Sequence, residues 1–354
     1  MTIVQFEHRD GILDLGWGHP LPSLLPTGAW AAAAASALQT YGWKALTYGH
    51  EPGPAPLREW IASRTNVQSA ECTFVTAGAS HGLSLVAQVL AEPGNTVLVD
   101  SPTYHYAFKI LTDRGLELIP VRAEDADEVG RLARQHRAAF LYVVPTFGNP
   151  TGRSLSLEQR HALAAQGLPI VEDDPYRELY YESAPLPFTA GNVISLGSFA
   201  KTVAPGLRLG WISATPELVG RLTRIGSVHS GGGVNHTTAL TMAEFAGSGA
   251  YGKHVALLRE RYRTHRDALS DAMNADRPDG GWFLWLRLPD GVDAESLLTV
   301  AERHGTSFVP GPRFHVDRRG GSDRVRLSFS HLPPAELTEA ARRLTVAIRS
   351  VLGQ

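Results

Sequence analysis

The chain contains very little cysteine, and this excludes two kinds of stabilising chemistry. Among its 354 residues there is one cysteine, Cys72, so an internal disulfide cannot form. A single thiolate is also too few for the cysteine-rich clusters that hold structural zinc. The sequence therefore predicts neither a disulfide scaffold nor a zinc centre, and we expect no metal site.

Long apolar runs are lacking as well. The most apolar early stretch, residues 29–38, is an alanine run much shorter than the about 20 residues that span a bilayer. Because alanine has the highest helix propensity, this stretch predicts a tightly packed helix. The first 17 residues show no basic start followed by an apolar run, so no signal peptide is evident. We expect a cytoplasmic protein with no membrane partner.

An excess of charge of either sign is missing too. The chain has 33 Lys and Arg against 35 Asp and Glu, a formal net charge of -2. A surface that binds nucleic acid normally needs a basic excess to neutralise phosphates. We therefore expect a small-molecule partner and no nucleic acid.

What is present is a globular composition with many turn residues. Apolar residues make up 43% and charged residues 19%, with 35 glycines and 23 prolines. At about 150 residues per domain, the length suggests two domains with a large buried core.

From residue 72 to about residue 214, short apolar strands alternate with helical patterns. Strands are expected at 73–76, 96–99, 116–121, 139–144, 169–172, 193–196 and 209–213. Helices are expected at 80–90, 104–113, 124–135 and 157–165. Continuous apolar strands separated by helices of about ten residues are typical of a mainly parallel sheet covered on both faces. The fold class is therefore α/β, with a large domain built on this sheet.

After residue 214 the pattern changes to longer helices with a few strands. Helices are expected at 216–226, 237–246, 251–273, 294–302 and 334–351, and strands at 282–287 and 324–328. This mixture predicts a smaller α+β domain. We divide the chain into an N-terminal segment, 1–45, that packs on the small domain and a partner subunit, a large domain, 46–250, and a small domain, 251–354.

Ligands of open parallel sheets bind beyond the carboxyl ends of the strands, so the residues that follow each strand are informative. The first strand is followed by Gly78, Ala79 and Ser80, which open a helix with small residues. Free N–H groups and the positive helix end make such a place suitable for an anion. Plain turn and capping chemistry is the alternative for this segment alone.

Polar and aromatic side chains follow the next strands. Tyr104 comes after one strand, where a packing role and a stacking role are both open, and Asn149 sits among turn residues after another. Asp173 ends a buried strand, where a carboxylate needs a positive partner such as a protonated pyridine nitrogen. Tyr176, three residues on, could reach a nearby phenolate-type oxygen.

Lys201 lies in a small, apolar segment between two expected strands. Most lysines are solvated surface cations, but burial beside another cation lowers a lysine pKa and makes the amine nucleophilic toward aldehydes. Ser198 and Arg208 flank Lys201 at offsets of three and seven residues, and both could bind a phosphate.

Taken together, these segments resemble the fold type I pyridoxal-phosphate enzymes, and specifically the class I and II aminotransferases. The 2-aminoadipate and kynurenine-type aminotransferases are most similar, as is the aminotransferase-like domain of the MocR regulators. The resemblance runs from about Leu15 to the C-terminus, and eight motifs occur in the family's order. They are YG…G…LR, T-x-G-x-x-x-G-L, PTY, NPTG, EDDPY, SF-x-K-T-x-APGLRLG, GG-x-FLW and RLSFS.

The resemblance implies pyridoxal 5'-phosphate as cofactor and gives roles to the residues around its ring. Lys201 matches the lysine that forms the Schiff base and then acts as general acid and base. Asp173 matches the carboxylate that keeps the pyridine nitrogen protonated, which makes the ring an electron sink. Asn149 and Tyr176 match the partners of the phenolic oxygen, and Tyr104 matches the ring stacked on its face.

Other matches concern the phosphate, the substrate and a second subunit. Gly78 and the backbone of Ala79, together with Ser80, Ser198 and Arg208, match the phosphate site. Arg326 matches the arginine that binds the substrate α-carboxylate with help from Asn149, and Gly18 matches a loop lining the substrate pocket. Tyr48 matches a tyrosine that reaches the partner's phosphate, which implies a homodimer with active sites at the interface.

The chain departs from the family pattern at three places. Ala79 stands where relatives often have a hydroxyl residue, and Ser80 stands where many have glutamine. The run 230–233, Ser-Gly-Gly-Gly, replaces a Ser/Thr loop and is either flexible or makes room for a larger substrate. The catalytic residues are intact, so these departures leave the substrate side chain open.

The expected reaction is transfer of the amino group of an L-amino acid to a 2-oxo acid. A second hypothesis is that the same scaffold cyclises, eliminates from or oxidises a modified amino acid, such as a guanidino amino acid. A third is an effector-sensing domain, which predicts a DNA-binding segment that this sequence does not show.

Overall fold

The computed structural model describes residues 9–353 except 66, 68, 187 and 189. Its centre is a seven-stranded sheet in the order β2-β8-β7-β6-β5-β3-β4. β8 runs antiparallel to both of its neighbours, and the remaining pairs are parallel. The mainly parallel sheet predicted from the sequence is thus confirmed.

The strands of this sheet are short, and helices connect β2 through β6, whereas no α-helix lies between β6, β7 and β8 in the described part of the chain. The strands are β2 (Thr73–Thr76), β3 (Thr96–Asp100), β4 (Glu117–Val121), β5 (Phe140–Val143), β6 (Ile170–Asp173), β7 (Val193–Ser198) and β8 (Gly210–Ser213). The helices between and after them are α3 (Ala79–Leu90), α4 (His105–Thr112), α5 (Ala126–His136), α6 (Leu157–Ala165) and α7 (Pro216–Thr223).

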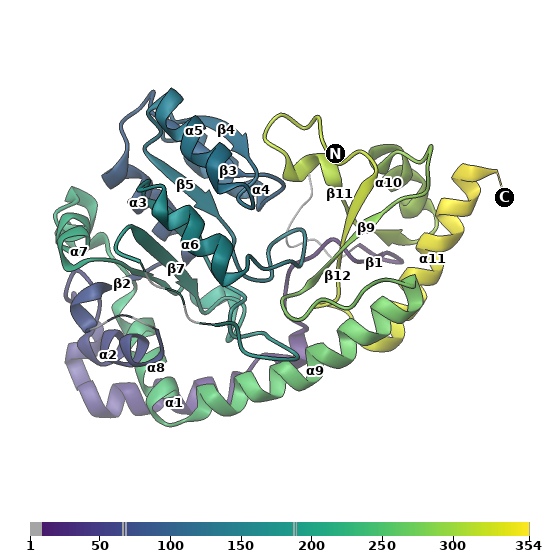
Figure 1. Ribbon diagram of the computed structural model, residues 1–354. Coiled ribbons are helices and arrows are strands. Elements are labelled where there is room, and N and C mark those ends of the chain that lie inside the picture. Colours follow the sequence, from purple (N-terminus) through teal and green to yellow (C-terminus); the bar gives the residue numbers. More distant parts are fainter. Residues whose placement is uncertain (1–8, 66, 68, 187, 189, 354) are drawn as a thin grey trace.

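Helices cover both faces because the strands are apolar on both sides. In β5, Phe140 and Tyr142 face the core formed with α3, α4 and α7, whereas Leu141 and Val143 face the core formed with α5 and α6. Side chains alternate between the faces of a strand, so a strand buried on both sides must be apolar throughout. Figure 1 shows the sheet between these helices.

The chain before the sheet forms two further helices. α1 (Thr27–Tyr41) contains the alanine run and packs against α8 (His236–Gly247), and α2 (Ala55–Arg64) packs against α8 as well. α2 was not predicted, because the proline- and glycine-rich segment 51–56 in front of it is typical of a loop.

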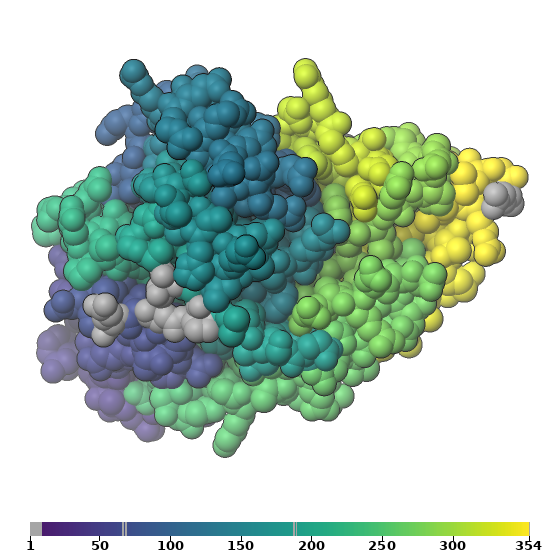
Figure 2. Space-filling model, viewed as in Figure 1, coloured from purple at the N-terminus to yellow at the C-terminus, as the bar shows by residue number. Residues whose placement is uncertain are grey.

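The small part of the molecule is built on a three-stranded antiparallel sheet, β11-β12-β9. Its strands are β9 (Phe283–Arg287), β11 (Val309–Pro310) and β12 (Arg324–Ser328), and its helices are α10 (Ala294–Arg303) and α11 (Pro334–Leu352). α9 (Ala250–Met273) packs along α11 and links this part to the large one (Figure 1). In Figure 2 the teal and yellow-green segments of the two parts meet along one seam.

The N-terminal segment contacts both parts. β1 (Leu13–Asp14) pairs in parallel with β10 (Thr306–Ser307) of the small part, whereas α1 lies on α8 of the large part. The domain boundaries given from the sequence therefore stay a prediction. Within the described ranges, no helix is long and apolar enough to cross a membrane.

Candidate active site

A cavity of about 410 Å³ lies beyond the carboxyl ends of the sheet strands, between the large and small parts. Eleven of the residues predicted from the sequence line it. They are Gly18, Ala79, Ser80, Tyr104, Asn149, Asp173, Tyr176, Ser198, Lys201, Arg208 and Arg326. Two others, Gly78 and Tyr48, are not part of the lining.

Lys201 supplies the amine of this cavity. The chain has four lysines, and the other three, Lys44, Lys109 and Lys253, are exposed on the surface. The Lys201 Nζ donates to the carbonyl of Gly18 at 2.9 Å and lies 4.8 Å from the ring centre of Trp282. Burial, followed by the positive charge of Arg326, lowers the pKa of Lys201 to about 8. A substantial fraction of the amine is therefore unprotonated and nucleophilic near neutral pH.

Asp173 is the carboxylate at the end of β6. Its Oδ2 accepts a hydrogen bond from the hydroxyl of Tyr142 at 2.8 Å, and its buried Oδ1 has no hydrogen-bond partner. Burial raises the pKa of Asp173 to about 6, while the Tyr142 hydrogen bond opposes that shift. A carboxylate oxygen in this state is suited to a cationic N–H donor in the cavity.

Two tyrosines bring aromatic surface into the cavity. Tyr104 precedes α4, and Tyr176 follows β6 with its ring centre 5.8 Å from the Lys201 Nζ. Burial raises the pKa of both phenols, so both stay protonated and able to donate. Tyr176 is also held edge-on against Trp282 and Phe283, which fixes its ring.

Arg326, on β12, is the cation on the side of the small part. Its Nη1 donates to Asn149 Oδ1 at 2.9 Å, and its Nε is buried without a partner. The guanidinium lies 4.3 Å from the ring centre of Phe283 and 5.1 Å from that of Phe314. This packing presents a planar, pre-oriented fork, the geometry that binds a carboxylate through two hydrogen bonds.

The opposite end of the cavity collects donors for an anion. Ala79 and Ser80 begin α3, so their backbone N–H groups are free, and Ser198 ends β7 close by. The Arg208 guanidinium donates to the carbonyls of Pro205 and Ala77 at 3.1 and 3.2 Å. A helix N-terminus with a hydroxyl and a guanidinium is suited to a phosphate.

Gly78 shapes this end without lining it. It has φ +96°, and a Cβ atom there would stand 2.7 Å from Arg208 Nη2. The tight turn that brings Arg208 against the start of α3 therefore requires glycine.

Tyr48 lies away from this cavity on the surface, with 86% of its side chain exposed. The glycine run lies beside it, since a Cβ on Gly231 would come within 2.7 Å of the Tyr48 ring. Residues 228–232 form one π-helical turn and do not line the cavity. The run thus allows close approach of Tyr48 and does not enlarge this cavity.

Sequence reasoning missed several lining residues. His105 and Tyr106 line the cavity, and Tyr142 supports Asp173 from behind, whereas Trp17 and His19 line it as members of the expected Gly18 loop. Tyr142 could have been found, because a hydroxyl in an otherwise apolar buried strand needs a partner. His105 carried no such signal, since its neighbours in the sequence do not reveal which way it points.

The arrangement can hold a flat, negatively charged ring compound that carries an aldehyde. The Lys201 amine can react with an aldehyde, the start of α3 with Arg208 can take a phosphate, Asp173 can accept from a ring nitrogen, and Arg326 can take a second carboxylate. This fold and site together define a pyridoxal-phosphate enzyme of fold type I.

Known proteins are similar to this chain in sequence and in fold. The profile of the family "aminotransferase class I and II" matches residues 11–344. The 2-aminoadipate transaminase of Thermus thermophilus is 34% identical, over 99% of this chain and 93% of the relative. Aromatic-amino-acid aminotransferase 1 of Thermococcus litoralis is 30% identical, over 98% of this chain and 90% of the relative. The chain belongs to the class I and II aminotransferases.

A solved structure supports the cofactor. The α-aminoadipate aminotransferase LysN from Thermus thermophilus, complexed with N-(5'-phosphopyridoxyl)-L-leucine, is similar with a TM-score of 0.88 and 33% identity. The match covers 97% of this chain and 94% of that chain. The protein is a pyridoxal 5'-phosphate-dependent aminotransferase.

The residues of this chain fit that cofactor. The unpartnered Asp173 Oδ1 offers an acceptor to a protonated ring nitrogen, and Lys201 is the lysine of the cavity. The start of α3 and Arg208 can take the phosphate, and the volume of about 410 Å³ accommodates a small ligand.

Proposed function

We propose that the protein moves the amino group of an L-amino acid to a 2-oxo acid, with Lys201, Asp173 and Arg326 as its principal site residues. The observation that carries the proposal is that Lys201, Asp173, Arg326 and the start of α3 converge on one cavity. When bound, the cofactor supplies an aldehyde that exchanges amines and a ring that accepts electrons from the substrate Cα.

Lys201 has two tasks in this proposal. Its Nζ attaches the cofactor, and after the amino donor takes its place the free amine moves a proton away from the substrate Cα. A pKa lowered to about 8 by burial and by Arg326 suits both tasks, because proton transfer is most efficient near the operating pH.

Asp173 and the tyrosines act on the ring. Asp173 holds the proton on the ring nitrogen, and the Tyr142 hydroxyl keeps the carboxylate in place at 2.8 Å. Tyr104 stacks on the ring, while Tyr176 and Asn149 donate to its phenolic oxygen. Since the Asn149 oxygen accepts from Arg326, its amide nitrogen is left to donate.

Arg326 binds the α-carboxylate, and Gly18 forms the wall of the substrate pocket. Arg208, Ser80 and Ser198 bind the phosphate, together with the backbone at Ala79 and the turn at Gly78. The cavity also contains Trp17, His19, His105 and Tyr106, an aromatic and polar lining for the substrate side chain. The relatives named for 2-aminoadipate and for aromatic amino acids set the first donors to test.

We also propose a homodimer in which Tyr48 reaches the partner's phosphate. Trp43, Leu46 and Tyr48 are 73%, 71% and 86% exposed, an apolar patch at the end of α1. Large apolar side chains exposed near one another in the chain are typical of an interaction site, and a second copy buries them. A cytoplasmic location stays a prediction of the sequence.

The test is an amino-transfer assay with isotopic labels. The holoenzyme is mixed with single ¹⁵N-labelled amino acids and 2-oxoglutarate, and products are identified by mass. We expect ¹⁵N-glutamate with at least one donor, none with Lys201→Ala, and unchanged transfer with Lys253→Ala, which alters an exposed lysine. Conversion of a donor to a cyclised, eliminated or oxidised product without labelled glutamate would support the second hypothesis instead.

A further inference from the structure

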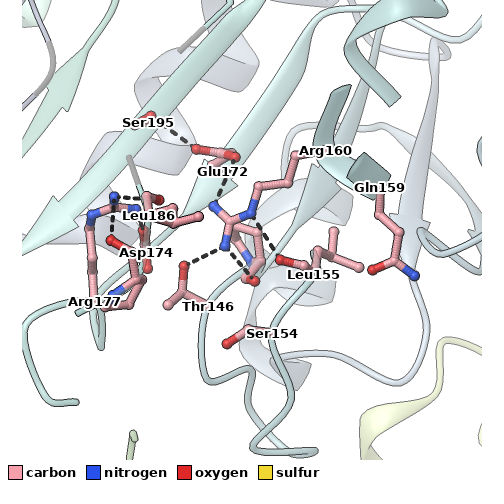
Figure 3. A network of polar contacts seen from close by, with 12 residues as sticks. Thr146, Ser154, Leu155, Gln159, Arg160, Glu172, Asp174, Arg177, Leu186 and Ser195 are labelled. Atoms are coloured by element: carbon pink, nitrogen blue, oxygen red, sulfur yellow. Dashed lines mark hydrogen bonds and ion pairs between the residues drawn. The ribbon is translucent and has the colours of Figure 1, made fainter. Parts of the chain in front are cut away.

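A buried ionic network lies directly behind the cavity, on the opposite face of the sheet. Successive residues of β6 alternate between faces, so Asp173 points toward the cavity while Glu172 points away from it. The contacts bear this out, since Asp173 meets Tyr142 and Glu172 meets Arg160 and Ser195. Figure 3 shows this network around Arg160.

Arg160, on α6, is the centre of the network and is only 5% exposed. Its Nη2 donates to the carbonyl of Pro145 and to the Thr146 hydroxyl, both at 2.9 Å. Its Nε donates to the carbonyl of Leu155 at 3.2 Å. The remaining arm, Nη1, faces Glu172 Oε1 at 3.8 Å.

These acceptors lie on both sides of Asn149. Pro145 and Thr146 precede it and Leu155 follows it, so one guanidinium holds the base of the loop between β5 and α6. The same group faces the carboxylate next to Asp173 in the sequence. Arg160 thus joins the loop that carries Asn149 to the strand that carries Asp173.

Removing these charged groups from water costs free energy, so their place beside the cavity calls for a reason. Glu172 is 5% exposed, and burial raises its pKa to about 7 against the opposing charge of Arg160. A buried ion pair is often no more stabilising than apolar packing of the same volume. Stability alone is therefore a weak reason for a charged pair at this place, whereas fixed geometry at the adjacent cavity is a direct one.

We propose that Arg160 is a positioning residue, which sets Asn149 and Asp173 at fixed places relative to each other in the cavity that would hold the cofactor. The inference rests on the proposed function, because it concerns residues that act on the cofactor. Lysine cannot replace it, since an ammonium lacks the planar fork that reaches several acceptors at once.

The test compares Arg160→Met with Arg266→Met. Arg266 is a matched control, because it is 3% exposed and bonds Glu182, Asp267 and the carbonyl of Pro278 without lining the cavity. Both variants leave carboxylates without their partner and lower the melting temperature of the apoprotein. Only Arg160→Met is expected to let Asn149 and Asp173 move relative to each other.

Four readouts separate positioning from stability. In the apoprotein, amide hydrogen exchange over residues 144–156 should become faster in Arg160→Met only. The pyridoxal-phosphate dissociation constant should rise by about tenfold or more, and kcat/KM should fall by about 10- to 100-fold, in Arg160→Met only. The pH midpoint of the holoenzyme's visible absorbance should move upward, because Asn149 would no longer stabilise the phenolic oxygen as an anion.

Equal changes in both variants for all four readouts would overturn the inference and leave Arg160 a structural residue. Should Arg160→Met not fold, Arg160→Lys keeps the charge facing Glu172 and should still speed exchange in the loop; wild-type exchange and affinity in that variant would contradict the proposal. If neither the wild type nor Arg266→Met binds pyridoxal phosphate, the proposed function itself is overturned.

Discussion

Asp173 combines a buried position with an unpaired oxygen, and this makes it sensitive to what occupies the cavity. Burial raises its pKa to about 6 from an ordinary value of 3.8, although the Tyr142 hydrogen bond and the charge of Lys201 oppose the shift. Between these two pH values the folded apoprotein keeps a proton that the unfolded chain has released. The stabilisation that comes from this bound proton is therefore present below about pH 4 and is lost as pH rises through about 6.

Asp173→Asn removes this dependence. As the pH rises from 4 to 6, we expect the unfolding free energy of the wild-type apoprotein to fall relative to that of the variant, as measured by urea titration. With cofactor bound, the protonated ring nitrogen pairs with the wild-type carboxylate. The difference in unfolding free energy then favours the wild type, and the variant binds the cofactor more weakly. A pH-independent difference in the apoprotein would contradict the raised pKa.

Arg326 is expected to act on the substrate carboxylate and not on the cofactor. Because Phe283 and Phe314 flank the guanidinium, Arg326→Lys loses a two-point bond that an ammonium does not restore. Such a charge-assisted pair is worth about 1.5–3 kcal/mol, so kcat/KM for the amino donor should fall about 10- to 100-fold. Cofactor affinity, measured by fluorescence titration, should stay within about twofold, and a comparable loss there would argue against this role.

The turn between β2 and α3 is the element that joins the phosphate site to the sheet. Gly78→Ala would place a Cβ at φ +96° and 2.7 Å from Arg208 Nη2. Backbone strain of this kind costs about 1–3 kcal/mol, and displacing Arg208 should also weaken cofactor binding.

Gly94→Ala is the matched control for that turn. Gly94 has φ +87°, but a Cβ at this position would meet nothing within 4 Å, so the variant carries the strain without the clash. Thermal unfolding should show a loss of stability in both variants, whereas a rise in the pyridoxal-phosphate dissociation constant should appear for Gly78→Ala alone. Similar pyridoxal-phosphate affinities in the two variants would show that Gly78 does not shape the phosphate site.

Elements with a strong local signal were predictable, and elements set by distant contacts were not. The apolar strand at 140–143 and the long helix at 250–273 carry their periodicity in the sequence. β1 and β10 have two residues each and exist because they pair with each other across 293 positions of chain. Likewise, spacing and family resemblance placed eleven residues in the cavity, but His105 and Tyr106 enter it through the direction that the start of α4 takes in the folded chain.

The exposed patch of Trp43, Leu46 and Tyr48 concerns the assembly of the whole molecule. These three large apolar side chains are mostly exposed, and the Tyr48 ring lies beside Gly231 of the glycine run. Burial between two copies would explain both features.

Sedimentation measurements can test this assembly. We expect the wild type to be a dimer and Trp43→Glu/Leu46→Glu to be largely monomeric with weaker cofactor binding, because each site loses the partner's Tyr48. Leu186→Glu, which charges another exposed leucine, 65% exposed, should remain dimeric. A wild-type monomer with full cofactor affinity would contradict the dimer.

The most direct measurement on the central claim is the mass of the peptide that carries the cofactor. The holoenzyme is reduced with borohydride, digested and mapped by mass spectrometry over its four lysines. We predict a phosphopyridoxyl group on Lys201, and none on the exposed Lys44, Lys109 and Lys253. Recovery of the group on one of those three lysines, or on no lysine at all, would contradict the site described here.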